Sequence, residues 1–279
     1  MVSPAPVLVA VRGLSRRYGG LLALSDYSLD LVEGTIHGVI GPNGAGKTTL
    51  FNLLSGMVRP TEGSISLLGQ DITQLTGDKV ALLGMARTFQ NIRLFGDMSV
   101  IDTVKVGVQA HHPASFWRTL LTTPGFRDQE ARIEARAAAL LGLVGLLDRA
   151  DRPARSLPYG DQRRLEIVRA LAIEPRVLLL DEPNAGMNPS ETDDLLAFIK
   201  RIRDEQGVTI ILIAHDIPLV MNVCDRIQVL NFGVLIAEGA PEHVRNHPDV
   251  VAAYLGQARG SPSDSDAAEA GEPAAVLDA

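Results

Sequence analysis

The sequence predicts an α/β fold in which helices cover a mainly parallel sheet. Residues 177–180 and 209–213 are apolar without alternation, a pattern typical of strands buried on both faces of a parallel sheet. Outside residues 91–157, strand-like runs alternate with helical stretches, as expected for strands joined by crossover helices. Residues 91–157 instead have alanine-rich sequence and almost no strand signal. We therefore expect a helical subdomain, residues 91–157, inserted into an α/β core made of residues 1–90 and 158–258.

The expected elements follow from local patterns. Strands are expected at residues 7–11, 28–31, 35–40, 63–68, 176–180, 208–213, 226–231 and 234–238. The last two flank the letters NFG, which indicate a hairpin turn at the sheet edge. Helices are expected after Gly46, over residues 127–147, after Gly160 and over residues 190–206. Asn188, followed by Pro189, gives the last helix a capped start.

The negative charge of the chain is concentrated in its last residues. The formal net charge is −7, and residues 260–279 carry five acidic and no basic residues, which leaves −7 − (−5) = −2 for the rest. A nearly neutral body lacks the clustered cations that a general nucleic-acid binder needs, so we expect no nucleic-acid partner. Because residues 259–279 are rich in Ala, Ser, Pro and acid, we expect them to form a disordered acidic tail.

No segment has the length of a membrane span. The longest apolar run, residues 137–147, is 11 residues long, whereas a helix needs about 20 to cross a bilayer. The start of the chain lacks the basic leader and long apolar region of a secretory signal. The single cysteine, Cys224, lies in an apolar stretch, suits a reducing compartment and is expected to be buried. We expect a cytosolic chain, for which any work at a membrane needs a partner that supplies the span.

A phosphate-binding loop is predicted at residues 39–49, VIGPNGAGKTT, which fit G-x-x-x-x-G-K-[ST] between a strand-like run and a helical one. Its glycines let consecutive backbone N–H groups face one anion, and the following helix adds the positive end of its dipole. Lys47 is expected to reach the β- and γ-phosphates, and the Thr48 hydroxyl to bind Mg²⁺. The residues expected to bind ATP are Gly41, Pro42, Asn43, Gly44, Ala45, Gly46, Lys47, Thr48 and Thr49.

Two carboxylates follow the buried strand in RVLLLDEP, residues 176–183. Open α/β sheets bind ligands at the carboxyl ends of their strands, which is where Asp181 and Glu182 fall. Asp181 is expected to hold Mg²⁺ through water, and Glu182 to accept a proton from the attacking water.

Together the two motifs predict a P-loop NTPase (RecA-like) core. They leave GTPases, kinases, helicases and transport ATPases open. A GTPase would carry N-K-x-D to read guanine, and no asparagine in the sequence is followed by lysine. A small-molecule kinase rarely has so large a helical insert.

Further motifs occur in a fixed order: RRYGG at residues 16–20, ARTFQNIRLF at 86–95, LPYGDQ at 157–162, NAGMNPSE at 184–191 and LIAHD at 212–216. With them, the chain from residue 7 to residue 256 resembles the ATP-binding subunits of ABC transporters. The resemblance implies a P-loop core with an antiparallel β subdomain and an inserted α-helical subdomain. The rival class is a soluble ABC-type ATPase of DNA repair or translation, but those usually fuse two ATPase modules or insert a coiled coil.

The resemblance also implies roles for single residues. Tyr18 would stack on adenine, Gln90 would bind Mg²⁺ or water and sense the membrane domain, and His215 would hold the γ-phosphate. Glu182, His215 and Gln90 are thus the expected catalytic residues. Asn188 falls in the loop that crosses a dimer. The signature residues, which would face the ATP of a partner, are Leu157, Pro158, Tyr159, Gly160, Asp161 and Gln162.

The mechanism implied by the resemblance is dimeric. Two ATP-binding subunits, identical or different, would pair head to tail around ATP and Mg²⁺, and hydrolysis would reopen the pair. Opening would be passed to transmembrane permease subunits at the cytoplasmic face of a bacterial inner membrane, and indirectly to a periplasmic or extracellular solute-binding protein. The helical subdomain would dock the permease, with Asn91, Arg93, Leu94 and Phe95 as lining residues.

The sequences of several stretches indicate one subgroup of these ATP-binding subunits. SGMVRPTEGSI, LLLDEPNAGMNP and GAPEHVRNHPDVVAAYLG resemble the ATPases of branched-chain amino-acid importers. Importers of urea, amides and other carboxylates share much of this wording and stay open as alternatives. The signature departs from the family form Leu-Ser-Gly-Gly-Gln at Pro158, Tyr159 and Asp161. Because Pro158 lacks the serine hydroxyl, we expect weaker dimer closure rather than lost function.

Overall fold

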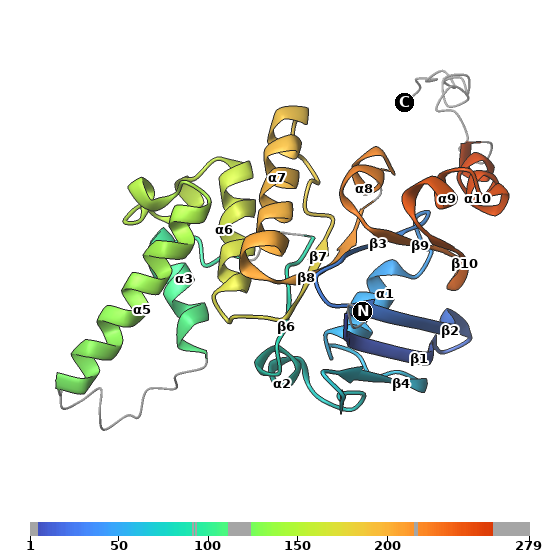
Figure 1. The fold of residues 1–279 in the computed structure, drawn as a ribbon, viewed down its shortest axis with the longest axis horizontal. Coiled ribbons are helices and arrows are strands. Elements are labelled where there is room, and N and C mark those ends of the chain that lie inside the picture. The colour runs from blue at the N-terminus through green and yellow to red at the C-terminus, as the bar shows by residue number, and fades with distance from the viewer. Residues whose placement is uncertain (1–4, 91, 93, 111–123, 215–216, 259–279) are drawn as a thin grey trace, which may run out of the picture.

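The computed structural model describes residues 5–90, 92, 94–110, 124–214 and 217–258. Their centre is a six-stranded sheet with the order β10-β9-β3-β8-β7-β6 (Figure 1). The five strands from β9 to β6 pair in parallel, and β10 pairs antiparallel with β9 at the edge. The strands are β3 (Ile36–Ile40), β6 (Met85–Arg87), β7 (Val177–Asp181), β8 (Thr209–Ile213), β9 (Arg226–Asn231) and β10 (Val234–Gly239).

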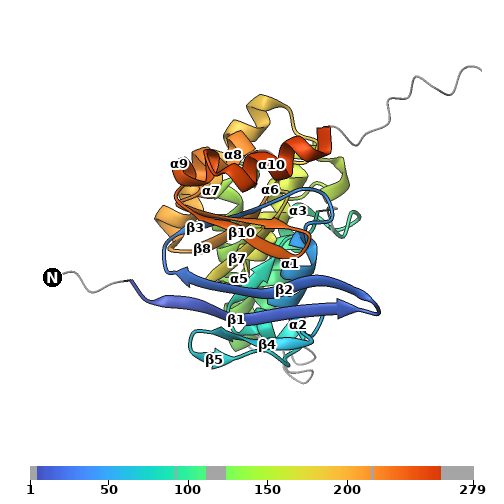
Figure 2. The same cartoon turned by 90° about the vertical axis from the view of Figure 1, so that its right-hand side faces the viewer.

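A second, antiparallel sheet has the order β2-β1-β4-β5. It consists of β1 (Val7–Tyr18), β2 (Leu21–Val32), β4 (Glu62–Leu67) and the short β5 (Gln70–Asp71). Figure 2 shows this sheet below the six-stranded one, with helix α1 (Lys47–Leu54) beside β2. Contacts between β10 and β2 join the two sheets directly.

Helices cover both faces of the central sheet. One side carries α1 and α2 (Gly77–Leu82), and the other carries the remaining helices (Figures 1 and 2). These are α3 (Val100–Gln109), α5 (Pro124–Leu143), α6 (Tyr159–Leu171), α7 (Pro189–Gln206), α8 (Ile217–Val223), α9 (Pro241–Arg245) and α10 (Pro248–Ala258). Two 3-10 turns, η1 (Leu147–Arg149) and η2 (Ala154–Ser156), lie between α5 and α6.

Alternate residues of the central strands enter two separate cores. Leu178 and Leu180 belong to the core under the long helices, whereas Val177 and Leu179 belong to the core that contains α1 and the antiparallel sheet. Successive side chains of a strand point to opposite faces, so β7 is buried on both sides, and all five of its residues are buried. This confirms the double burial expected from its unbroken apolar sequence, and β8 shows the same pattern.

Other local expectations are confirmed as well. Asn231 pairs with Val234, so Phe232 and Gly233 form a two-residue hairpin turn, both with positive φ, at the predicted edge of the sheet. Asn188 caps α7, and Glu191 completes a capping box with it. Cys224 is a buried thiol.

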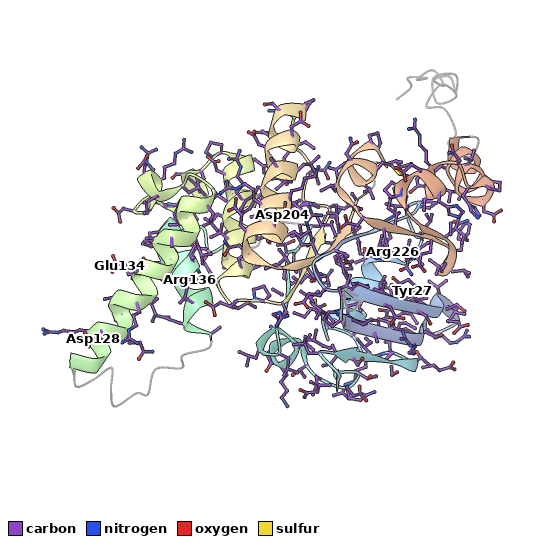
Figure 3. All side chains as sticks on the ribbon, in the orientation of Figure 1. Tyr27, Asp128, Glu134, Arg136, Asp204 and Arg226 are labelled. Carbon is purple, nitrogen blue, oxygen red and sulfur yellow. The ribbon has the colours of Figure 1, made fainter. Side chains whose placement is uncertain are left out.

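Some element boundaries were wrong. The helix expected over residues 127–147 spans Pro124–Leu143 and ends just before Gly145, which has a φ of 68°. Figure 3 shows that α5 directs Asp128 and Glu134 away from the other helices, while Ile133, buried, faces the core. Strand β6 and helices α2, α8 and α9 were not predicted, since each is seven residues long or shorter. The longer α3 and α10 were not predicted as separate helices either.

Candidate functional site

The loop between β3 and α1 has a backbone that requires glycine. Gly41, Gly44 and Gly46 have φ angles of 152°, 79° and 103°. A Cβ on Gly41 would lie 2.1 Å from the Leu230 carbonyl oxygen, and one on Gly46 would lie 2.6 Å from the Ala23 carbonyl oxygen. Nothing lies within 4 Å of a Cβ on Gly44, so here the positive φ is the constraint. The loop therefore curls as an anion-binding loop does.

Lys47, the first residue of α1, turns its side chain back into this loop. Its Nζ donates hydrogen bonds to the carbonyl oxygens of Gly41 (2.6 Å) and Pro42 (2.9 Å), and the residue is only 7% exposed. Burial lowers the pKa of Lys47, and the nearby charges of Glu182 and Asp181 act in the opposite direction. A cation is thus fixed at the N-terminus of α1, where an anion is already favoured.

A cavity of about 450 Å³ opens in front of the loop. It brings together residues that are far apart in the sequence: Tyr18 at the end of β1, Gln90 after β6, Glu182 after β7, and the loop residues from Asn43 to Thr49. Gly41 and Pro42 do not line it, but their carbonyl oxygens accept the hydrogen bonds of Lys47, which does. Tyr18, Gln90, Glu182 and the loop residues 43–49, all predicted from the sequence, therefore line one cavity.

Two residues at this end of the site, Arg16 beside Tyr18 and Phe232 in the cavity wall, were not predicted from the sequence. Arg16 places its guanidinium 4.6 Å from the centre of the Tyr18 ring and covers one face of it. Phe232, in the β9–β10 turn, also lines the cavity and is 83% exposed. Gly, Asn and Asp dominate two-residue hairpin turns, so the phenylalanine in the letters NFG was the sequence signal that could have found it.

Asp181 ends β7 and is almost completely enclosed. Its carboxylate lies 2.8 Å from the guanidinium of Arg87, with 7% and 6% of the two side chains exposed. Arg87 also donates to Asn52 (2.7 Å) on α1, and its guanidinium lies over the rings of Phe51 and Phe89, 5.5 and 5.2 Å from their centres. Among the described residues, those that line the cavity include Thr48, Gln90 and Glu182 but not Asp181. Sequence reasoning missed Arg87.

Glu182 has a strained backbone and a defined partner. Its φ is 44°, which is uncommon for a residue with a side chain. The Gln90 side-chain amide donates a hydrogen bond of 3.0 Å to its carboxylate. Strain of this kind often persists at functional sites, where the surrounding structure holds it in place.

The signature residues lie away from this cavity. None of residues 157–162, all of which are described, lines it. Pro158 is the N-cap of α6, and no side chain caps the helix. Gly160 is buried, and a Cβ there would lie 3.2 Å from the Glu191 carboxylate. Tyr159 is 43% exposed, and a Cβ on Gly186 would lie 3.4 Å from its ring.

Arg149 neutralises the extra acid of the signature. The guanidinium of Arg149, from η1, forms an ion pair with the carboxylate of Asp161. Because Asp161 is half of an ion pair, its charge opposes a nearby phosphate less than a lone carboxylate would. His215, Asn91 and Arg93 lie outside the described residues, as does the tail at 259–279.

Comparisons with known proteins show the family to which this chain belongs. The family model described as "ABC transporter" matches residues 24–185, more than half of the chain. The chain belongs to the ABC transporter family. A second model, "Branched-chain amino acid ATP-binding cassette transporter", matches residues 234–259.

Related proteins match almost the whole chain. The high-affinity branched-chain amino acid transport ATP-binding protein LivG of Salmonella typhimurium is 48% identical over 90% of this chain and 98% of its own length. LivG of Escherichia coli is 47% identical over the same shares. BraF of Pseudomonas aeruginosa, with the same description, is 48% identical, again over 90% of this chain and 98% of its own.

Solved structures match in fold. The ADP conformation of MJ1267, an ATP-binding cassette of an ABC transporter, is 28% identical with a TM-score of 0.79, over 90% of this chain and all of that one. CbiO1 from Clostridium perfringens, part of the transporter complex CbiONQ, is 28% identical with a TM-score of 0.74, over 90% and 95% of the two chains. The predicted fold class is confirmed, and the protein is an ATP-binding, ATP-hydrolysing subunit of an ABC transporter. In the part of the chain that the structure describes, no helix is long and apolar enough to cross a bilayer.

Proposed function

We propose that this ATPase powers the import of branched-chain amino acids through a membrane permease. The observation that carries the proposal is the 47–48% identity, over 90% of the chain, to ATP-binding proteins named for branched-chain amino acid transport. The match of residues 234–259 to a model of such transporters supports the same solute class. We place the protein at the cytoplasmic face of a bacterial inner membrane, as a peripheral subunit.

ATP is assigned to the cavity beside the phosphate loop. In this proposal Lys47 and the backbone of residues 41–49 bind the phosphates, while Tyr18 offers the ring face not covered by Arg16 to adenine. Glu182, held by Gln90, accepts the proton of the attacking water. His215 is assigned to the γ-phosphate.

Mg²⁺ fits the oxygen ligands at this site. The Thr48 hydroxyl, the Gln90 side chain and the Asp181 carboxylate are hard oxygen donors of the kind Mg²⁺ prefers. When bound, Mg²⁺ would neutralise charge on the phosphates. Asp181, buried against Arg87, would act through water, as the sequence suggested.

A second ATP-binding subunit is needed to complete the site. Residues 157–162 do not line the cavity of their own chain, so in the proposed head-to-tail dimer they face the ATP of the partner. We favour two different subunits, because importers of the resembled group commonly have two ATPases.

The permease is assigned to a second, more apolar cavity, of about 420 Å³, where α2, α3 and α6 meet. Its walls include Met57 and Phe95, which are 51% and 57% exposed. Of the lining residues expected from the sequence, Phe95 lines this cavity, while Leu94 packs against the core. An apolar groove of this kind accepts an amphipathic helix, which we assign to a cytoplasmic segment of the permease.

We also propose the division of the chain into a core, residues 1–90 and 158–258, a helical insert, residues 91–157, and a disordered acidic tail, residues 259–279. The packing of α6 against α3 and α5 supports an insert that is mechanically tied to the signature helix. No nucleic acid is assigned as a partner.

Purification of the complex from the native host tests the proposal. A permease and a solute-binding protein should co-purify, and the binding protein should bind leucine, isoleucine or valine. Preference for urea, an amide or another carboxylate would replace the solute while keeping the transport role. Co-purification of ribosomes or DNA without a permease would overturn that role.

A further inference from the structure

A buried ion pair, Arg163 and Glu166, lies on α6 just beyond the signature residues. Both side chains are 0% exposed, and the guanidinium lies 2.8 Å from the carboxylate. Neither residue lines the nucleotide cavity. A buried ion pair contributes little net stability, since desolvation offsets the attraction between the charges. The role of this ion pair is therefore sought in the groups to which it is hydrogen-bonded.

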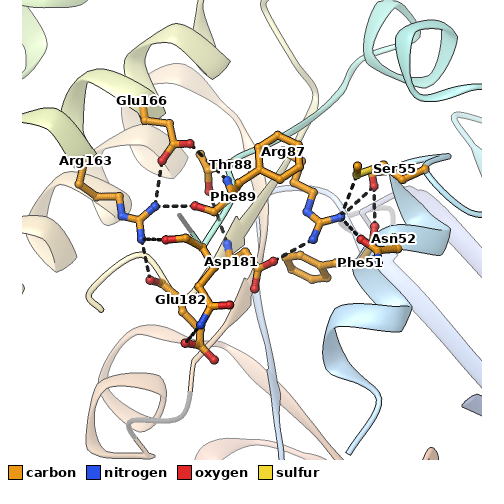
Figure 4. A network of polar contacts seen from close by, with 12 residues as sticks. Phe51, Asn52, Ser55, Arg87, Thr88, Phe89, Arg163, Glu166, Asp181 and Glu182 are labelled. Atoms are coloured by element: carbon orange, nitrogen blue, oxygen red, sulfur yellow. Dashed lines mark hydrogen bonds and ion pairs between the residues drawn. The ribbon is translucent and has the colours of Figure 1, made fainter. Parts of the chain in front are cut away.

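The pair makes hydrogen bonds to the backbone of Phe89 and Gln90. Arg163 donates to the carbonyl oxygens of Phe89 (2.6 Å) and Gln90 (2.8 Å). Glu166 accepts a hydrogen bond of 3.4 Å from the Phe89 N–H. Figure 4 shows these contacts reaching from α6 across to the segment after β6.

The same guanidinium also reaches the backbone after β7. Arg163 donates to the carbonyl oxygen of Glu182 at 3.2 Å, from the nitrogen that binds the Gln90 carbonyl (Figure 4). The side chains of Gln90 and Glu182 are in turn bonded to each other at 3.0 Å. One cation thus fixes the main chains of both residues whose side chains meet at the cavity.

Arginine suits this arrangement because its planar fork presents five N–H donors in fixed directions. Lysine would keep the charge opposite Glu166, but a single ammonium cannot reproduce the spacing of the fork. A buried carbonyl oxygen without a hydrogen-bond donor is costly. Loss of the arginine fork is therefore expected to shift the backbone of Phe89, Gln90 and Glu182.

We propose that Arg163 is a positioning residue that sets Gln90 and Glu182 relative to α6, so that hydrolysis depends on the position of the signature helix. This inference rests on the roles proposed above for Gln90 and Glu182. In the dimer, α6 carries the residues that face the partner's ATP. Arg163 would then tie each subunit's hydrolysis to the occupancy of the other site.

The first test compares Arg163→Lys with Arg164→Lys in the full-length protein. Arg164 is the next residue on α6 and forms ion pairs with Asp161 and Asp194. Arg163→Lys should lower kcat about 10- to 100-fold, the cost of a misplacement near 1 Å, with ATP affinity changed less than about twofold. Arg164→Lys should leave both unchanged. A purely structural role would instead lower thermal stability and leave kcat unchanged below the melting temperature, which would overturn the proposal.

The second test asks whether Arg163 acts through Glu182. In single-turnover hydrolysis, Arg163→Lys should cause no further loss once Glu182→Gln is present, because coupled residues are not additive. An equal fold-loss in both backgrounds would overturn the proposal. If Glu182→Gln alone keeps normal turnover, the proposed base role fails instead, and Gln90→Ala then serves as the background for Arg163→Lys. Should Arg163→Lys fail to fold, the double variant Arg163→Gln with Glu166→Gln removes both charges, and the same loss of kcat is expected.

Discussion

The guanidinium of Arg87 lies 2.8 Å from the carboxylate of Asp181, and both side chains are more than nine-tenths buried. Arg87 also lies over the aromatic rings of Phe51 and Phe89 and donates a hydrogen bond to Asn52 on α1. The residue proposed as a Mg²⁺ ligand is therefore neutralised, without Mg²⁺, by a cation on the neighbouring strand.

Arg87→Met should destabilise the protein by about 3–5 kcal/mol, because it leaves the Asp181 charge buried without its partner. Urea unfolding measures this loss. Arg176→Met is the control: its ion pair with Glu33 is exposed at 51% and 33%, so at most about 1 kcal/mol is expected. Equal losses in the two variants would contradict the importance given to burial here.

Phe232→Ala should weaken ATP binding about 2- to 10-fold, since one aromatic contact contributes about 0.5–1.5 kcal/mol. Affinity for inorganic tripolyphosphate, which has no base, should not change. Val234→Ala, on the same hairpin and 49% exposed, should change neither value. An equal loss for ATP and tripolyphosphate would place the effect in the phosphate loop rather than at the base.

His37 should make the protein sensitive to mild acid. Burial lowers the pKa of His37 from 6.5 to about 4, so between these values the unfolded chain binds a proton that the folded chain does not. Stability is therefore lost as the pH falls from about 6.5 to 4, by an amount of the order of 3 kcal/mol.

His37→Gln should remove this part of the pH dependence, measured as the free energy of unfolding in urea at pH 7 and pH 4.5. A His37→Gln variant that loses as much stability as the wild type would show that other groups cause the acid sensitivity.

Pro158→Ser should strengthen ATP-driven dimerisation, measured by light scattering in the Glu182→Gln background. The serine would restore the missing hydroxyl, and at the N-cap of α6 it can also accept a backbone hydrogen bond. Unchanged or weaker dimerisation would contradict this explanation of the unusual signature.

The sequence predicted the parts of the site that lie within single motifs. The phosphate loop, the buried strand before Asp181, the hairpin turn at Phe232 and the cap at Asn188 each depend on a few adjacent residues, so their patterns were sufficient. Strand β6, only three residues long, gave no periodic signal, and α3 was hidden in the alanine-rich insert.

Contacts between distant segments could not be predicted in this way. Arg87 reaches Asp181 across 94 positions, and Arg163 reaches Phe89 across 74. Each pairs with a carbonyl or carboxylate on another element, and neither local spacing nor hydrophobic period carries that information. The buried arginines thus became visible only once the central sheet and α6 were in place.

The most direct measurement is ATP hydrolysis by the complete transporter in proteoliposomes, with leucine-loaded solute-binding protein on the side opposite the ATPase. If this chain powers branched-chain amino-acid import, the loaded binding protein should raise hydrolysis and leucine accumulation together. Glu182→Gln should abolish both. Hydrolysis that responds to another solute instead of leucine would contradict the solute assignment, and hydrolysis without uptake of any solute would contradict the transport role.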